Sequence, residues 1–313
     1  MKVEVTSAEL FVDERIRITK NRLAPADGAD ADVPRACVVT GIHGDELEGQ
    51  YVAFELARRI QEHPELLRGV VDIYPAANPL GVSTITRGVP LFDLDMNRIF
   101  PGCEDESLTE HLAAEIIEDI RGADLAFDIH ASNIFLREIP QIRVNEITAR
   151  KLVPLAKRAN VDFVWVHSSA TVLRSTLAYS LNDIGVPTLV VEMGVGMRIT
   201  RNYGDRLCDG ILNLLIDKGI WAGERPTNLR EPIVSTDGKV SFINADEPGI
   251  FLPSTRHGNM VVEGQDLGVI ADATTGEVRQ RVLSPTNGLL FTLREYPIVT
   301  PGSLIARILG GLS

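Results

Sequence analysis

The chain has 313 residues and a formal net charge of −12, from 31 lysines and arginines against 43 aspartates and glutamates. Apolar residues make up 44% of it and charged residues 24%, which is typical of a folded globular protein and excludes wholesale disorder. The acidic balance argues against nucleic acid and anionic membrane surfaces as partners, because both are bound through clustered lysine and arginine. An anionic small substrate would need a local cluster of positive charge.

Neither the cysteines nor the N-terminus indicates export. Cys37, Cys103 and Cys208 are too few and too scattered for a disulfide framework. Residues 1–10 include acids and lack the apolar core of a signal peptide. No stretch approaches the roughly 18 apolar residues that a membrane span needs. We therefore expect a cytoplasmic protein with no membrane partner.

Strand-like and helix-like segments alternate up to residue 222. Short runs rich in β-branched residues predict buried strands, and helical patterns lie between them. The expected strands cover 35–40, 69–75, 125–129, 161–166 and 186–193, and the expected helices cover 47–62 and 107–122. In the second helix, Glu110 follows Ser107 at the spacing of a capping box. This alternation predicts an α/β sheet layered with helices.

The pattern changes near residue 222. Residues 221–232 are polar and contain prolines, which is typical of a linker. Short strand-like pieces with frequent glycine or proline follow, and they show almost no helical period. We therefore predict an α/β domain over 1–222 and a smaller, β-rich domain over 223–313.

The segment GIHGDELEG, residues 41–49, follows the first of these strands and opens the first helix. His43 and Glu46 are three residues apart, so at a helix start both side chains can point toward one spot. Imidazole and carboxylate are zinc ligands, and a catalytic zinc typically takes three protein ligands and leaves one position for water. The motif alone is weak evidence, because a polar turn with a capping acid has the same pattern.

His130, in the segment LAFDIHAS, is the candidate third ligand. It lies just past an apolar strand, and sites in α/β sheets form beyond the carboxyl ends of strands. Asp128 points to the same side of that strand and could accept the second ring N–H of a ligand histidine. The alternative for Asp128 is an acid that makes a surface hydrogen bond.

Three further segments carry candidate site residues. Glu192, in VVEMG, follows an apolar strand and is either a solvated acid or a general base beside a zinc-bound water. Asn97 and Arg98 lie in DLDMNRIFPG, and Arg87 lies upstream. An arginine fork suits a substrate carboxylate, although an isolated arginine is most often a surface residue. His167, which follows a strand, is a weaker pocket candidate.

Together these segments resemble the succinylglutamate desuccinylase/aspartoacylase family of zinc-carboxypeptidase-like metallohydrolases. The matching segments, in the family's order, are GIHGDELEG, DLDMNRIFPG, FDIHASNIFLREIPQIRV and VVEMG. The resemblance implies a mixed sheet flanked by helices, with the β-rich tail as the family's C-terminal domain. It also implies one zinc ion per chain, held by His43, Glu46 and His130.

The resemblance extends to catalytic and substrate-binding residues. It implies Glu192 as the general acid/base. Asn97 and Arg98 match the family's Asn-Arg pair, which contacts the substrate and polarises the scissile carbonyl. Arg87 is a looser match to a substrate-binding arginine.

One segment resembles a particular branch of the family. HASNIFLREIPQIRV is similar to a bacterial deacylase branch that includes enzymes acting on N-acetylated diamino acids, and within it Arg137 and Arg143 are candidate substrate contacts. The aspartoacylase branch has an arginine upstream of the glutamate where this chain has Asn182. This difference argues against an aspartate-type substrate.

The function implied is hydrolysis of the amide bond of a small anionic or zwitterionic N-acyl amino acid. A zinc carboxypeptidase acting on peptides is one alternative. A non-catalytic metal-binding or ligand-binding homologue is another, although Glu192 argues against it because binding zinc does not require that residue. For the C-terminal domain we expect either a lid over the site or a contact between copies in a homo-oligomer.

Overall fold

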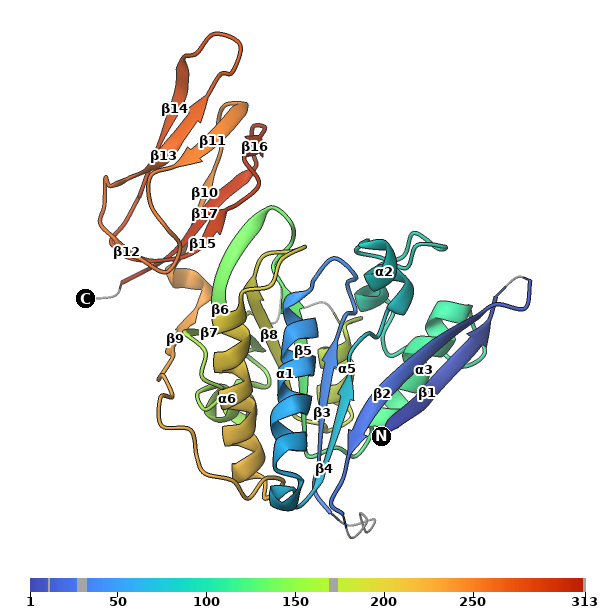
Figure 1. Cartoon of the computed structure of the whole chain (residues 1–313). Helices are drawn as coiled ribbons and strands as arrows, with labels where there is room; N and C mark the ends of the chain where they lie inside the picture. Colours follow the sequence, from blue (N-terminus) through green and yellow to red (C-terminus); the bar gives the residue numbers. More distant parts are fainter. Residues whose placement is uncertain (11, 27–32, 169–173, 312–313) are drawn as a thin grey trace.

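The structure, a computed structural model, describes residues 1–10, 12–26, 33–168 and 174–311 (Figure 1). Its strands are β1 (Lys2–Glu9), β2 (Arg15–Leu23), β3 (Arg35–Thr40), β4 (Val70–Tyr74), β5 (Leu125–Ala131), β6 (Leu136–Asn145), β7 (Phe163–His167), β8 (Thr188–Gly194), β9 (Ile233–Thr236), β10 (Val240–Asn244), β11 (Gly249–Pro253), β12 (Met260–Val261), β13 (Asp266–Ala271), β14 (Val278–Leu283), β15 (Gly288–Arg294), β16 (Ile298–Val299) and β17 (Leu304–Gly310). Its helices are α1 (Glu48–Glu62), α2 (Pro79–Thr84), α3 (Leu108–Ile120), α4 (Ala149–Ala156), α5 (Leu177–Asp183) and α6 (Arg201–Asp217), with short 3-10 turns η1 (Pro64–Leu66), η2 (Met96–Arg98) and η4 (Asp237–Lys239). Each predicted strand and helix is present, with its ends shifted by at most two residues.

One long mixed sheet is the frame of the molecule. Its strand order is β1-β2-β4-β3-β5-β8-β6-β15-β17-β10. Strands β4, β3, β5 and β8 run parallel, whereas β6 runs antiparallel to β8. Together with the helices on its faces, this sheet confirms the predicted fold class.

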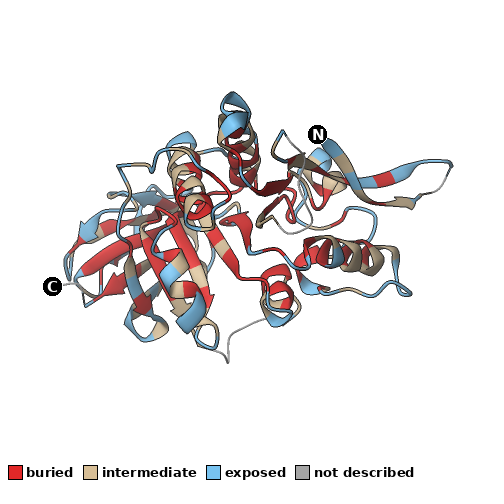
Figure 2. Ribbon diagram, turned by 90° about the horizontal axis from the view of Figure 1, so that it is seen from below, coloured by how far each residue is buried: buried red, intermediate tan, exposed pale blue. Residues whose placement is uncertain are grey.

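Helices cover both faces of the sheet. Helices α1 and α6 lie side by side on one face, and α3 and α5 pack on the other (Figure 1). Successive side chains of β3 point to opposite faces of the sheet, so this strand contributes to the hydrophobic core on each face. Val38 packs against α1 and α6, and Val39 packs on the side of α3 and α5. Buried residues accordingly concentrate in the strands and on the inner sides of the helices (Figure 2).

The predicted start of α3 is confirmed. The hydroxyl of Ser107 accepts a hydrogen bond from the backbone N–H of Glu110, whose carboxylate accepts one from the backbone N–H of Ser107. This is a capping box, which satisfies backbone donors that the first turn of a helix leaves free. Across the described ranges, the helices are all too short or too polar to cross a membrane.

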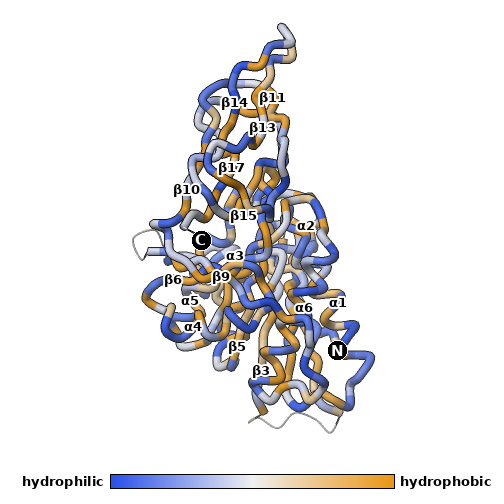
Figure 3. The backbone as a smooth tube through the Cα atoms, turned by 90° about the vertical axis from the view of Figure 1, so that its left-hand side faces the viewer, coloured by the Kyte–Doolittle hydropathy of each residue, from blue (hydrophilic) through white to orange (hydrophobic). Residues whose placement is uncertain are grey.

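The region after residue 222 is rich in strands, as predicted, but these strands divide between two sheets. Strand β9 pairs with β7, and β10, β15 and β17 extend the main sheet because β15 pairs with β6. Strands β11, β13, β14 and β16 form a second sheet at the end of the molecule farthest from the helices (Figure 3). The sequence pattern did not indicate this division, and a domain boundary at residue 222 stays a prediction.

Candidate active site

His43, Glu46 and His130 lie together at the carboxyl ends of β3 and β5. Their ligand atoms all lie within 4.8 Å of one another, and all three residues are buried. Nδ1 of His43 lies 2.8 Å from Oε1 of Glu46, and Nδ1 of His130 lies 3.0 Å from Oε2. The structure therefore brings together the three residues that the sequence predicts as metal ligands.

The chain reaches this geometry because β3 and β5 are parallel neighbours, so their carboxyl ends meet at one edge of the sheet. The loop after β3 is also held against α2. A Cβ atom on Gly44 would lie 1.9 Å from the backbone carbon of Gly81, so only glycine permits this approach. The loop thus places His43 and Glu46 immediately before α1.

Each histidine pairs with a carboxylate through its other ring nitrogen. Nε2 of His43 lies 3.0 Å from Oδ1 of Asp95, and Nε2 of His130 lies 2.9 Å from Oδ1 of Asp128. Such carboxylates fix the ring orientation and tautomer of a metal-binding histidine, which leaves both Nδ1 atoms facing Glu46. Asp128 is one of the predicted residues, but Asp95 is not, and its only signal in the sequence is its place two residues before Asn97 in DLDMNRIFPG.

The donor set fits a zinc ion. Two imidazole nitrogens and a carboxylate converge, as in catalytic zinc sites. The buried Nδ1 of His43 meets only Glu46 within the described ranges. Burial raises the pKa of Glu46, but hydrogen bonds and charge from His130 and His43 outweigh it and lower the pKa to about 2. Glu46 is therefore ionised at neutral pH, as a metal ligand must be.

Glu192 lies opposite His130 across the β5–β8 pair. Burial raises its pKa to about 7, against the opposing charges of Arg143 and His130, and this value suits a general base. The chain turns two residues later at Gly194, which has a φ of +66°. A Cβ atom there would lie 1.8 Å from Oε1 of Glu48, so this turn requires glycine.

Asn97, Arg98 and Arg87 line the same cavity as the two histidines. The side-chain oxygen of Asn97 accepts a hydrogen bond from the backbone N–H of Leu177 at 3.0 Å, which ties η2 to α5. The two arginines are about equally exposed, but Arg87 forms ion pairs with Glu46 at 3.0 Å and with Asp95 at 3.4 Å. Arg98 donates to the backbone carbonyl of Asn97 at 2.7 Å and comes no closer than 3.9 Å to Asp95. Of the two arginines, Arg98 is the freer to meet a substrate.

The other two predicted arginines lie in different places. Arg143 lines the cavity, and its Nη1 lies 3.1 Å from Oε1 of Glu192. Arg137 instead forms an ion pair with Glu295 at 3.0 Å and is not among the residues that line the cavity within the described part of the chain. The structure therefore brings Arg143 into the site and leaves Arg137 outside it.

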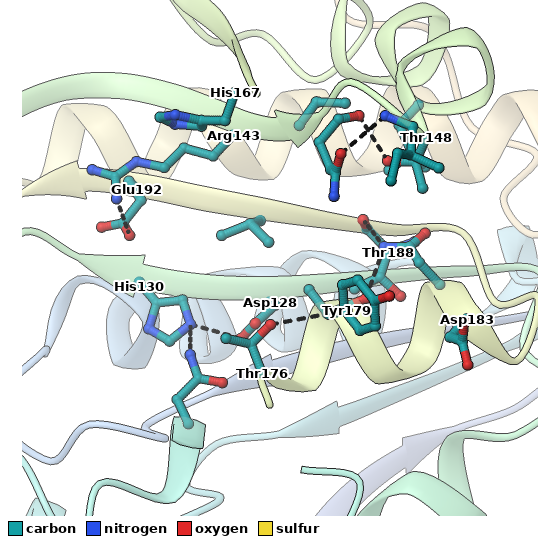
Figure 4. A pocket seen from close by; sticks show the side chains of 18 of the residues that line it. Asp128, His130, Arg143, Thr148, His167, Thr176, Tyr179, Asp183, Thr188 and Glu192 are labelled. Carbon is teal, nitrogen blue, oxygen red and sulfur yellow. Dashed lines mark hydrogen bonds and ion pairs between the residues drawn. The ribbon is translucent and has the colours of Figure 1, made fainter. Parts of the chain in front are cut away.

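The cavity has a volume of about 640 Å³ and runs from the histidines along β8 toward α4 and α5 (Figure 4). His167, the weaker pocket candidate, is one of its lining residues. Nδ1 of His167 lies 3.0 Å from Oδ1 of Asp237, whereas its buried Nε2 has no hydrogen-bond partner among the residues that the structure covers. Burial, together with Arg143, lowers the pKa of His167 to about 4, so the ring is neutral at pH 7.

Comparison with known proteins gives matches over most of the chain. The succinylglutamate desuccinylase/aspartoacylase catalytic domain matches residues 32–217. A relative from Halomonas elongata, N-alpha-acetyl-L-2,4-diaminobutyric acid deacetylase, is 26% identical over 285 residues, which is 88% of this chain and 82% of the relative.

Solved structures match the fold over almost the whole chain. A succinylglutamate desuccinylase/aspartoacylase from Rhodobacter sphaeroides is 23% identical, with a TM-score of 0.80, and the match covers 96% of this chain and 91% of that one. The product-bound ectoine utilization protein EutE from Ruegeria pomeroyi is also 23% identical, with a TM-score of 0.81 and coverage of 96% and 90%. At this identity the likeness shows the fold alone.

Proposed function

Because the chain belongs to the succinylglutamate desuccinylase/aspartoacylase family, we propose that it is a zinc-dependent deacylase that hydrolyses the amide bond of an N-acyl amino acid. The observation that carries this proposal is the convergence of His43, Glu46 and His130 at the edge of a cavity that the two histidines line together with Glu192. A metal site without a neighbouring base would suit binding alone. Here the carboxylate of Glu192, which is 14% exposed and has a raised pKa, lines the same cavity as the two histidines and would supply that base.

His43, Glu46 and His130 would hold one zinc ion per chain through their facing ligand atoms. Zinc bound there would supply Lewis acidity, lowering the pKa of a water ligand toward about 7 and polarising the scissile carbonyl. Asp95 and Asp128 would keep the two imidazoles in the tautomers that leave Nδ1 free for the metal.

Glu192 is the proposed general base and general acid. Its carboxylate accepts the proton of the attacking water and later returns that proton to the leaving nitrogen. Arg98 presents its guanidinium at the cavity and would stabilise the negative charge that develops on the carbonyl oxygen. Asn97 would hold the substrate beside it.

The proposed substrate is small and carries a carboxylate. Three arginines line the cavity, but three acids, Asp128, Asp183 and Glu192, line it too. Arg87 and Arg143 are paired with acids, whereas the nearest acid to Arg98 among the described residues lies 3.9 Å away. Arg98 is therefore the arginine proposed to attract the carboxylate of an anionic or zwitterionic N-acyl amino acid. N-acetylated diamino acids are the first substrates to test, since the Halomonas elongata relative is named for one.

We also propose that the enzyme works in the cytoplasm. Cys37, Cys103 and Cys208 are all free thiols, and two of them are buried, which suits a reducing compartment.

The deciding experiment is metal analysis followed by a hydrolysis screen. The purified protein should contain about one zinc per chain and release carboxylic acid from a panel of N-acyl amino acids, detected by mass spectrometry. A series of peptides with free C-termini serves as the control, because a carboxypeptidase would release amino acids from these instead. Full zinc content without hydrolysis of any compound would overturn the proposal in favour of a binding protein.

A further inference from the structure

A fully buried glutamate lies on β6, the strand next to the one that carries the proposed base. Glu138, on β6, is 0% exposed, and its carboxylate accepts hydrogen bonds from four side chains. Gln141 donates to Oε2 at 2.9 Å and Arg143 donates to the same oxygen at 3.0 Å. Thr292 donates to Oε1 at 3.1 Å, and Arg307 also donates to Oε1. A carboxylate at such depth is tolerated only when it is paired in this way.

Arg143 joins this buried glutamate to the proposed base. Its Nη2 bonds to Oε2 of Glu138, and its Nη1 lies 3.1 Å from Oε1 of Glu192. A guanidinium is planar and rigid, so fixing one of its nitrogens fixes the direction of the others. The carboxylate of Glu138 therefore sets where Arg143 meets Glu192 (Figure 4 shows this last pair).

Two of the four donors come from the C-terminal strands. Thr292 lies on β15 directly opposite Glu138 in the register of the β6–β15 pair. Arg307 lies on β17, and its Cζ lies 5.8 Å from the centre of the Trp165 ring, the same distance as that of Arg143. The two guanidinium groups thus pack near one indole while they share one carboxylate. Without the C-terminal strands, Oε1 of Glu138 would lose both donors.

We infer that Glu138 and Arg307 are positioning residues for the proposed deacylase, and that the chain of contacts Arg307–Glu138–Arg143–Glu192 holds the general base in its catalytic orientation. The inference rests on the proposed function. It gives the C-terminal strands a part in catalysis in addition to a lid or an oligomer contact. The competing explanation is a cluster that stabilises the fold and leaves the chemistry untouched.

The test compares Glu138→Gln, which keeps the shape and removes the charge, with Arg307→Met, which keeps the packing against Trp165. We expect kcat to fall roughly 10- to 100-fold in each, because a small misplacement of a reacting group costs this much. KM and zinc content should stay within about twofold of the wild type, because the metal ligands are untouched. Arg307→Lys, which restores the charge, should recover part of the lost kcat.

Asp72→Asn, which removes a buried charge far from the cavity, is the matched control. It should lower stability without lowering kcat in the folded enzyme. If Glu138→Gln and Arg307→Met behave like this control, losing stability but keeping wild-type kcat, the positioning role is overturned.

A crystal structure of the zinc-loaded Glu138→Gln variant tests the inference without an activity measurement. We expect Arg143 to move away from Oε1 of Glu192, and an unchanged pair would overturn the inference. If the wild-type chain hydrolyses no substrate, the proposed function has failed. The crystal structure still decides whether Glu138 positions Glu192.

Discussion

Two groups of buried charges lie at opposite ends of β3. The group at its start, which we name the Asp72 cluster, consists of Lys20, Arg22, Arg35, Asp72 and Asp119. Nζ of Lys20, which is 4% exposed, lies 3.1 Å from the fully buried Asp72 and 2.7 Å from Asp119. The group at the other end consists of His43, Glu46 and His130, with Asp95 and Asp128 behind them.

The two groups differ in what their polar atoms face. In the Asp72 cluster, cations and carboxylates face one another, and these five residues do not line the cavity that holds the histidines. At the other end, the Nδ1 atoms of His43 and His130 converge on one carboxylate beside a cavity of about 640 Å³. Buried charge alone therefore does not identify a site in this protein, whereas convergent donor atoms beside a cavity do.

The comparison predicts that the two ends respond differently to mutation, and the largest effect is expected at Glu192. Glu192→Ala should lower kcat roughly 10²- to 10⁴-fold, because it removes the carboxylate proposed to move the proton. Zinc content, measured by atomic absorption, should not change.

Glu192→Gln is the matched variant, since it keeps the size of the side chain and should lose as much activity as the alanine variant. A Glu192→Ala protein that loses zinc but recovers its rate on reconstitution would contradict the assignment of the base.

The Asp72 cluster should show the opposite behaviour. Asp72→Asn removes the carboxylate that pairs with Lys20, Arg22 and Arg35, and uncompensated buried charge should lower the free energy of unfolding by about 3 kcal/mol. Urea unfolding measures this loss, and kcat of the folded protein should not change. Glu118→Gln, which breaks an exposed pair with Arg121, should change the stability by less than about 0.5 kcal/mol.

A substitution at Asp128 tests whether the carboxylates behind the histidines support zinc binding. Asp128→Asn removes the charge that orients His130 but leaves all three metal ligands in place. We expect zinc affinity to fall roughly 10- to 100-fold, measured by competition with a chelator. An unchanged affinity would mean that Asp128 only stabilises the strand.

The smallest effect that we predict is a shift in pH dependence. Burial raises the pKa of Glu192 to about 7, and bound zinc would lower it from there. The base is active as a carboxylate, so kcat/KM should fall as the pH drops through this pKa. Arg143 lowers the pKa, so in Arg143→Met the acid limb should move to higher pH. A limb that moves to lower pH would contradict this assignment.

The sequence was enough to predict that His43, Glu46 and His130 come together. His43 and Glu46 follow β3 and His130 lies near the end of β5, and the carboxyl ends of neighbouring parallel strands converge. The same reasoning predicted the place of Glu192. Each motif alone is weak evidence, but the motifs occur together in the order typical of one family, and this is what made the residues recognisable.

The residues that were missed depend on contacts between distant segments. Glu138 and Arg307 are 169 residues apart, and nothing in either local sequence indicates that β17 would join the main sheet one strand away from β6, on the far side of β15. Asp95 contacts His43 across 52 residues. Arg137 and Arg143 lie on the same strand, and the sequence predicts both equally as substrate contacts. Only the fold shows that Arg143 lines the cavity.

The pairing of β15 with β6 has a consequence for how this protein could be shortened. A chain ending at residue 222 would lose β9 and β15 and so uncover the edges of β7 and β6. Unpaired strand edges are templates for pairing with other chains. We expect such a fragment to aggregate. Residues 1–222 should therefore not be stable as a separate domain. Within the C-terminal part, β11, β13, β14 and β16 form a sheet of their own, so changes in these strands should disturb the main sheet least.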